Sequence, residues 1–222
     1  MCILTSVSES GESVGLAYSS PSSTAHGKLS REQKEITLLE YTKSMGRIDE
    51  NEAKLLFGQL ALALAGCHER LVIHRDLKLP SILINPETGI IRIADFSHSS
   101  AINRASEPMG DRRGSPAYVS PEILVSKTYS GQAADCWSLG VILYAMLCGV
   151  FPFAAQTPQL LFDKIMRAEP AYPDHLSAQA CSLLRGLLKP TPSTRLNTAD
   201  ALDHPWLSMS SEEDQMVPDM EE

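Results

Sequence analysis

The sequence predicts a mainly α-helical fold with one hydrophobic core and a small β-hairpin. Residues 50–71 carry apolar side chains at helical spacing, and residues 132–147 are apolar on nearly every face. Two short apolar runs, 81–84 and 90–93, flank a turn sequence. A helix with one apolar stripe buries that stripe, whereas a helix that is apolar all round lies in the centre of a domain. We therefore expect helices packed around the segment 132–147.

The first long helix is expected over residues 50–71. Its apolar residues recur every three or four positions, and a helix brings such positions onto one face. These residues are Ala53, Leu56, Leu60, Leu64 and Cys67. We expect this face to be buried.

A β-hairpin is expected next, because Asn85-Pro86-Glu87-Thr88-Gly89 separates the two short apolar runs. Asn and Pro are typical of turns, and Gly supplies the backbone conformation that closes one. A loop from about residue 97 to 121 follows the hairpin and precedes the central helix.

Three shorter helices are expected after the central one, near residues 158–168, 177–188 and 198–204. Thr198 is the expected N-cap of the last helix, because a Thr hydroxyl accepts N–H groups at helix starts. We find no internal repeat.

Composition narrows the class of protein. The chain has 222 residues and a net charge of −8, which disfavours nucleic acid or an anionic membrane as a partner. No uninterrupted apolar run approaches the roughly 18 residues that a membrane span needs. The five cysteines contain no Cys-x-x-Cys pair, so we expect reduced core residues and no zinc site. The cytoplasm, the nucleus or both are therefore the expected locations.

Three segments differ in character. Residues 1–30 are rich in Ser and poor in apolar periodicity, which predicts a disordered segment. Residues 31–207 are the predicted folded domain. Residues 208–222 carry six acidic residues and no Lys or Arg, as expected of a disordered acidic tail.

Short motifs in a fixed order carry the chemistry. His74-Arg75-Asp76-Leu77-Lys78 precedes the hairpin, Asp95-Phe96-Ser97 follows it, and Ser120-Pro121-Glu122 comes later. An Asp with a Lys two residues on can align a substrate hydroxyl and neutralise a transferring phosphoryl group, and a second Asp can hold Mg²⁺. Together with Asp135-Cys136-Trp137-Ser138-Leu139-Gly140 and Arg195, these motifs resemble those of the protein kinase superfamily.

The resemblance implies structural roles for several of these residues. His74 is expected to pack on Phe96, Arg75 to bridge to the activation loop, and Glu122 to form a buried ion pair with Arg195. The resemblance also implies a structural role for Asp135.

The parts of a kinase that grip ATP are not recognisable in the chain. A kinase needs a Gly-rich loop, a strand Lys and a helix Glu before the region where the resemblance starts, near Leu39. No two glycines in this chain are separated by a single residue, and Lys28 and Lys34 lie in no apolar strand pattern. We therefore expect a protein-kinase-like C-terminal lobe with the N-terminal lobe absent, which leaves a truncated isoform or an incomplete gene prediction as explanations.

The remaining kinase-like site lacks two of the residues that a kinase has there. Ser81 stands where a kinase has the Asn that holds a second metal, and Ser97 replaces the Gly of the metal motif. Asp76 and Lys78 are thus interpreted as vestigial catalytic residues, and Ser81 and Asp95 as vestigial nucleotide-metal positions. No cofactor is expected; ATP and Mg²⁺ would be needed only by an active kinase.

The tail carries a peptide that resembles the ligase-binding motif of Tribbles pseudokinases. The sequence Asp214-Gln215-Met216-Val217-Pro218-Asp219 is similar to the family's Asp-Gln-x-Val-Pro-Asp/Glu peptide, which recruits an E3 ubiquitin ligase. The stretches 115–124 and 129–135 also resemble Tribbles sequences. Calcium/calmodulin-type and AMP-activated-type kinases share much of the pattern and are the nearest rival families.

The resemblance implies an adaptor that binds a client protein on the lobe, recruits the ligase through the tail, and so regulates signalling and protein degradation. Residues 201–207 resemble the site through which Tribbles proteins engage MAP kinase kinases, although a similar His-Pro-Trp sequence closes ordinary kinase domains. Two alternatives remain: a fragment or isoform of a Ser/Thr kinase that transfers the γ-phosphate of ATP to proteins, and a dominant-negative binder of kinase substrates that recruits no ligase.

Overall fold

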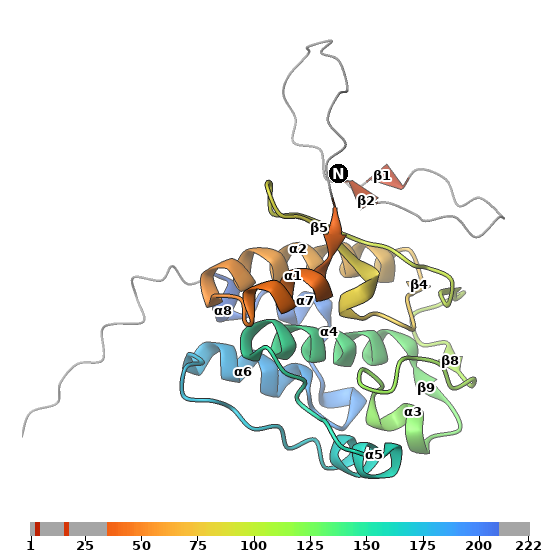
Figure 1. Ribbon diagram of the computed structural model, residues 1–222. Helices are drawn as coiled ribbons and strands as arrows, with labels where there is room; N and C mark the ends of the chain where they lie inside the picture. The colour runs from red at the N-terminus through yellow and green to blue at the C-terminus, as the bar shows by residue number, and fades with distance from the viewer. Residues whose placement is uncertain (1–2, 5–15, 18–34, 209–222) are drawn as a thin grey trace, which may run out of the picture.

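The helix α4 (Gly131–Cys148) runs through the middle of the structure. The structure is a computed structural model, and it describes residues 3–4, 16–17 and 35–208. Figure 1 shows α4 between an upper pair of helices, α1 (Leu38–Met45) and α2 (Glu50–Glu69), and a lower one, α6 (Ala178–Leu187). The prediction of a central, all-round apolar helix is confirmed.

Length and composition alone would let α4 cross a membrane, and it is the one such helix among the described residues. With 83% of it buried inside the domain, however, it has the character of a core helix. Its Trp137 stacks on Phe153 at 5.6 Å between ring centroids, which ties the helix to the loop that follows it.

The helix α2 buries the predicted stripe, since all five of its expected core residues are buried. It begins after Asp49, whose side chain accepts the Asn51 N–H at 2.9 Å. It ends at Glu69, two residues earlier than predicted, because Leu71 has a left-handed backbone with φ 58°. No L-residue with a Cβ continues a right-handed helix from that conformation.

The predicted hairpin is present, as β5 (Ile82–Asn85) and β6 (Ile90–Ile93). The two strands are antiparallel, with Ile82 opposite Ile93 and Asn85 opposite Ile90. The Asn85 side chain accepts the Glu87 N–H at 2.9 Å and so shapes the turn. A third strand, β3 (Ile36–Thr37), pairs with β5 and was not predicted.

The helix α1 was also not predicted, although its sequence contains a start signal. Thr37 and Glu40 form a capping box: the Thr37 hydroxyl accepts the Glu40 N–H, and the Glu40 carboxylate accepts the Thr37 N–H. A Thr followed three residues later by Glu is the pattern that would have revealed this helix.

The segment predicted as a loop over residues 97–121 contains two short strands. The strand β7 (Ser100–Ala101) pairs with β4 (Val72–Ile73), and β8 (Pro108–Met109) pairs with β9 (Tyr129–Ser130). Two-residue strands leave no periodic pattern to read, so only the pairing partners reveal them. The short helix α3 (Pro121–Val125) follows the loop.

The three predicted C-terminal helices occur close to where the sequence places them, as α5 (Pro158–Arg167), α6 and α7 (Thr198–Leu202). The short helix α8 (Pro205–Ser208) was not predicted. The described domain also contains the 3₁₀ turns η1 (Leu79–Ser81) and η2 (Pro192–Thr194). The expected N-cap at Thr198 is wrong: Asn197 caps α7, because its side chain accepts the N–H groups of Ala199 and Asp200.

The cysteines of the described residues are all free thiols, and Cys67, Cys136 and Cys181 are buried. Most of the segment 1–30 and nearly all of the acidic tail lie outside the described residues. Within the former, β1 (Ile3–Leu4) pairs with β2 (Leu16–Ala17) as an antiparallel strand pair.

Candidate functional site

The backbone of the loop from His74 to Lys78 is held in place by a carboxylate of α4. Asp135 is buried, and its two oxygens accept the N–H groups of His74 and Arg75, each at 2.9 Å. The ring nitrogen Nε2 of His68 lies 3.0 Å from the same carboxylate. Arg75 itself has φ 70°, a conformation that a non-glycine residue adopts only at a cost. The expected structural role of Asp135 is therefore to fix a strained loop onto the central helix.

His74 and Phe96 pack together as predicted. Their ring centroids are 4.9 Å apart, and His74 Nε2 lies 3.1 Å from the Ala94 carbonyl oxygen. His74 is completely buried. This contact joins the loop to the segment that follows the hairpin, and it leaves His74 no path to a substrate.

Arg75 also contacts the following loop, as predicted. It donates to the Ser100 hydroxyl at 2.8 Å and forms an ion pair with Asp111. Hydrogen bonding and charge from Arg75 lower the pKa of Asp111 to about 2. Asp111 and Ser100 were not identified from the sequence, because nothing in the local pattern distinguishes them from other loop residues.

Both oxygens of the Asp76 carboxylate have partners in the same chain. One oxygen accepts the Ser115 N–H at 2.7 Å, and the other forms an ion pair with Lys78. Lys78 Nζ also donates to the Ser115 hydroxyl at 3.1 Å. Asp76 and Lys78 therefore lie together, and Ser115 contacts both. A substrate hydroxyl at Asp76 would therefore share the carboxylate with Ser115 and Lys78.

Tyr118 supports this closed arrangement. Its hydroxyl accepts the Leu79 N–H at 3.3 Å. Burial raises the pKa of Tyr118 to about 12, and the Asp76 charge adds to the effect. The phenol therefore stays neutral and remains part of the packing beneath the loop.

Ser81 is turned into the protein. It is buried, and its hydroxyl donates to the Lys78 carbonyl at 2.8 Å and accepts the Lys78 N–H at 3.0 Å. Both contacts close the turn η1. The hydroxyl thus has its donor and one acceptor site in use within the turn.

Asp95 is exposed, whereas Ser81 is buried. Its carboxylate accepts the Ser97 hydroxyl at 2.6 Å, and this hydrogen bond lowers the pKa of Asp95. The left-handed backbone of the motif falls at Asp95, with φ 57°, and not at the serine that replaces Gly.

Among residues 35–208 no group of three or more His, Cys, Asp or Glu side chains could hold a metal ion. A kinase-type site needs the Mg²⁺ ions held by an Asp and an Asn together with the nucleotide phosphates. Here Asp95 is bonded to Ser97, and Ser81 faces inward. The residues present do not fit a two-metal nucleotide site.

Glu122 and Arg195 form the predicted buried ion pair. The two hydrogen bonds between them measure 2.7 and 2.8 Å, and the side chains are 5% and 0% exposed. Arg195 also donates to the carbonyl oxygens of Ala133 and Lys189, and it lies over the Trp137 ring at 5.1 Å. The pair therefore ties α3 to the core helix and to the segment before α7.

The partner-binding residues predicted in the tail, Asp214, Gln215, Met216, Val217, Pro218 and Asp219, lie outside the described residues.

Comparison with known proteins agrees with the kinase-like motifs. Residues 25–207 match the protein kinase domain family. Tribbles homolog 1 of Mus musculus is 40% identical over 194 residues, which cover 82% of this chain and 52% of that protein. Tribbles homolog 2 of Canis lupus familiaris is 40% identical over 193 residues, covering 81% and 56%. Tribbles homolog 3 of Homo sapiens is 44% identical over 167 residues, covering 74% and 47%.

The chain thus spans about half the length of the curated relatives that it matches. Its order of motifs, the buried pair between Glu122 and Arg195, and these similarities agree with one another. The chain belongs to the protein kinase family, and among curated proteins its sequence is similar to those of the Tribbles homologs.

Proposed function

We propose that this chain is an adaptor without phosphotransfer activity, which binds a client protein on its lobe and recruits an E3 ubiquitin ligase through its tail. The observation that carries the first part is the closed state of Asp76. Its two carboxylate oxygens are engaged by Ser115 and Lys78, while the Ser81 hydroxyl is used inside η1.

Phosphoryl transfer depends almost entirely on positioning the reactants and on stabilising charge. In this chain the base position is covered, and the second metal position holds a serine that faces inward. These features support a scaffold function for this chain, without phosphoryl transfer.

Radiolabelled ATP with Mg²⁺ or Mn²⁺ and generic protein substrates tests the catalytic part. We expect no incorporation above background. Incorporation that disappears in both Asp76→Ala and Asp95→Ala would overturn the proposal, because two independent site residues would then be needed for it.

The ligase part is supported by the tail peptide. Val217 and Met216 supply apolar anchors, Pro218 limits the freedom of the unbound peptide, and the flanking acids favour a basic rim on the partner. A few anchors usually dominate the affinity of such short segments.

Calorimetry of the whole chain against the propeller domain of the ligase tests this part. We expect the combined Val217→Ala and Pro218→Ala change to weaken binding by at least roughly tenfold, or about 1.4 kcal/mol. Met220→Ala is the matched control, because it removes an apolar tail residue just outside the motif. Equal binding by the double variant and the wild type would remove the main support for ligase recruitment.

A peptide of residues 208–222 should bind as tightly as the whole chain if the tail acts as an autonomous peptide. Much weaker binding by the whole chain would mean that the lobe retains the tail.

Other parts of the proposal concern the remaining partners and the location. The client occupies the lobe, and a MAP kinase kinase is a further candidate partner through residues 201–207. In that stretch Trp206 is fully buried, packs on Phe57 at 5.8 Å and donates to Glu50 at 2.7 Å. Its exposed neighbours Asp203 and Pro205 are therefore the ones available to a partner. Location in the cytoplasm, the nucleus or both, with neither nucleic acid nor membrane as partner, completes the proposal.

The second candidate function is a fragment of an active Ser/Thr kinase. The observation that favours it is that Asp76, Lys78 and Asp95 are all retained. The assay above, repeated on any longer form of the protein that carries a Gly-rich loop and a strand Lys, separates the two candidates.

A further inference from the structure

Several serine and threonine residues of the sequence stand directly before a proline. They are Ser20, Ser115, Ser120, Thr157 and Thr191. Proline has no backbone N–H, so an enzyme pocket that offers no acceptor there prefers proline, because any other residue would bury an unpaired N–H. The residue before a proline is also held extended, a shape in which peptide segments can enter a cleft. Each of these five residues is therefore a candidate acceptor for a proline-directed protein kinase.

Two of the five are already engaged inside the domain. Ser120 is completely buried. Ser115 donates its N–H to Asp76, and its hydroxyl accepts a hydrogen bond from Lys78. Ser20 lies outside the described residues. The structure therefore leaves a choice between Thr157 and Thr191.

Thr191 is exposed, but its segment is tied to the core. The two residues before it, Lys189 and Pro190, accept hydrogen bonds from Arg195 through their carbonyl oxygens, at 2.9 and 3.3 Å. Arg195 is the completely buried arginine of the ion pair described above. Drawing Thr191 into the cleft of another enzyme would break contacts of this anchor, which is costly.

Thr157 lies in a segment that is open to solvent. Every residue from 154 to 160 is exposed, and the backbone of Thr157 is extended, with φ −127° and ψ 151°. Its hydroxyl accepts the Leu160 N–H at 3.3 Å and so caps α5. Lys164 donates to the Ala154 carbonyl at 2.8 Å, an exposed hydrogen bond that water can replace. Thr157 is therefore the more accessible of the two threonines.

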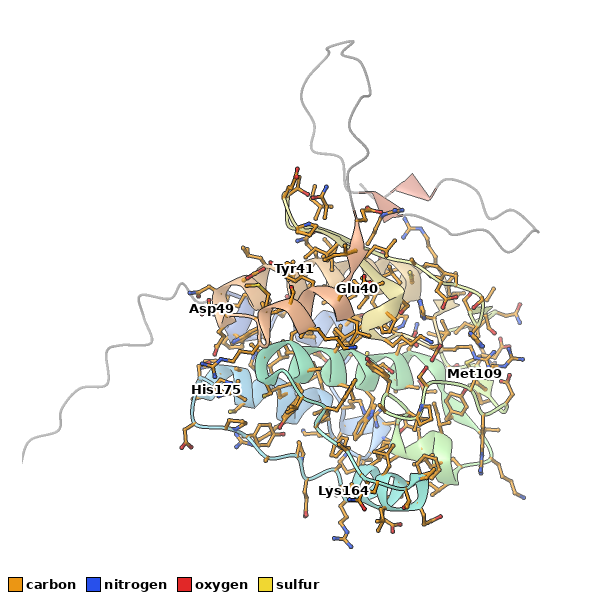
Figure 2. The ribbon with its side chains drawn as sticks, in the orientation of Figure 1. Glu40, Tyr41, Asp49, Met109, Lys164 and His175 are labelled. Carbon is orange, nitrogen blue, oxygen red and sulfur yellow. The ribbon has the colours of Figure 1, made fainter. Side chains whose placement is uncertain are left out.

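The surroundings of Thr157 suit a negative charge. A hollow of about 600 Å³ lies beside it, lined by residues on both sides of Thr157 in the sequence. The charged residues of this hollow are Lys164, Arg167 and Asp163, so two basic side chains stand against one acidic one. Figure 2 shows Lys164 at the lower edge of the molecule, on the opposite side from Glu40 of α1.

We propose that Thr157 is a phosphorylation site for a proline-directed protein kinase, and that its phosphate then serves as the N-cap of α5. That kinase supplies the γ-phosphoryl group of ATP. The Thr157 oxygen forms the new P–O bond, the bond from phosphorus to ADP breaks, and the hydroxyl proton passes to the base of the kinase. The chain is the substrate in this step, so the inference is independent of ligase recruitment.

The phosphate has both a structural and a surface effect at this position. It carries about −1.5 to −2 charges and three acceptor oxygens, and negative charge stabilises the start of a helix. The helix α5 has ten residues, of which only Ile165 is buried, and helices this short are marginal by themselves. The phosphate also lies beside Leu160, whose side chain is 53% exposed. Modification therefore changes an apolar surface into an anionic one.

Phosphorylation of the full chain tests the site. The probe is a purified, activated mitogen-activated protein kinase, used as the proline-directed enzyme with Mg²⁺ and ATP on a Ser20→Ala chain. Mass spectrometry then locates the phosphate, which we expect on Thr157. Pro158→Ala, a change at an exposed position, should slow the modification at least roughly tenfold, as one unpaired N–H implies. No phosphate on Thr157, or an equal rate in Pro158→Ala, would overturn the inference.

Two peptides separate the effect of sequence from that of the fold. They comprise residues 151–163 and 186–197, and each contains one Thr-Pro dipeptide. We expect the kinase to modify both as free peptides, but to modify only Thr157 in the folded chain. Equal rates at Thr157 and Thr191 in the folded chain would contradict the argument from their contacts. Failure of the 151–163 peptide as a substrate would contradict the argument from its sequence.

Melting curves test whether the phosphate caps α5. Phosphorylation should raise the melting temperature by about 1–3 °C, the effect of one anion at a helix start in a domain of this size. Thr157→Ser is the matched control, because it keeps the hydroxyl and should show the same rise. Thr157→Ala treated with the kinase should show none. An unchanged or lower melting temperature of the phosphorylated wild type would overturn the proposed cap.

Discussion

Two arginine–carboxylate pairs in this protein have the same chemistry and opposite surroundings. Arg195 and Glu122 are almost completely buried, and Arg195 also bonds to three backbone carbonyls. In the other pair Arg75 is buried while Asp111 is half exposed. A pair with both side chains buried is costly to break. An exposed carboxylate, in contrast, can be replaced at its arginine by water or by another anion. The first pair is therefore an anchor of the fold, and the second is a contact that can be replaced.

The largest expected effect is on the buried pair. Glu122→Ala or Arg195→Ala alone should lower the free energy of unfolding by roughly 3–5 kcal/mol, because each leaves an unpaired buried charge. Thermal or urea unfolding measures this. A double Glu122→Leu and Arg195→Met variant is the control, and it should lose less than either single variant. Unchanged melting temperatures in both single variants would show that the pair does not anchor α3.

A smaller loss of stability is expected when Asp135 is changed, because this residue accepts hydrogen bonds from the loop 74–78. Asp135→Asn keeps the shape but replaces one carboxylate oxygen by an N–H₂ group, which cannot accept the N–H of His74 or Arg75. We expect about 1.5–3 kcal/mol of lost stability, the range for hydrogen bonds to charged groups. Urea unfolding beside the exposed Asp163→Asn variant gives the comparison. Equal stability of the two variants would contradict the role of Asp135.

The exposed member of the second pair should matter least for folding. Asp111→Asn should change the free energy of unfolding by less than about 1 kcal/mol, and the change should shrink as salt is added. Melting curves at low and high ionic strength test this. A loss as large as that of Glu122→Ala would mean that Asp111 is part of the fold and cannot be displaced.

The pH dependence of the stability difference between the wild type and Asp111→Asn gives a further test of the exposed pair. Because the pKa of Asp111 is lowered from 3.8 to about 2 in the folded state, its contribution is present above pH 3.8 and is lost as pH falls through 2. The difference in melting temperature between the wild type and Asp111→Asn should be constant from neutral pH to about pH 4. A difference that already disappears near pH 6 would mean that another group titrates at this pair.

Much of the fold could be predicted from local sequence. Helices α2 and α4 are recognisable because apolar spacing within one segment decides which face is buried. The hairpin is recognisable because its turn residues lie between its two strands. Errors occurred where signals were short: the true cap Asn197 is adjacent to the expected Thr198, and α1 lasts for only eight residues.

The sequence by itself determined the identities of the site residues and the family to which they belong. Asp76, Lys78, Asp95 and the pair Glu122–Arg195 were all recognisable from order and spacing, because a family motif is a property of the chain. The acidic tail motif is likewise a property of the sequence alone.

Only the tertiary structure decided the state of the site. Ser115 reaches Asp76 across 39 positions, and Asp111 reaches Arg75 from the same loop. No periodicity or motif encodes which loop serine or carboxylate makes these contacts. They depend on how β7 and β8 pair with strands far away in the chain, and on the backbone angles of Arg75 and Gly114. The physical reason is that a local pattern reports which residues are buried, whereas the partner of a charge is set by the packing of segments that are distant in sequence.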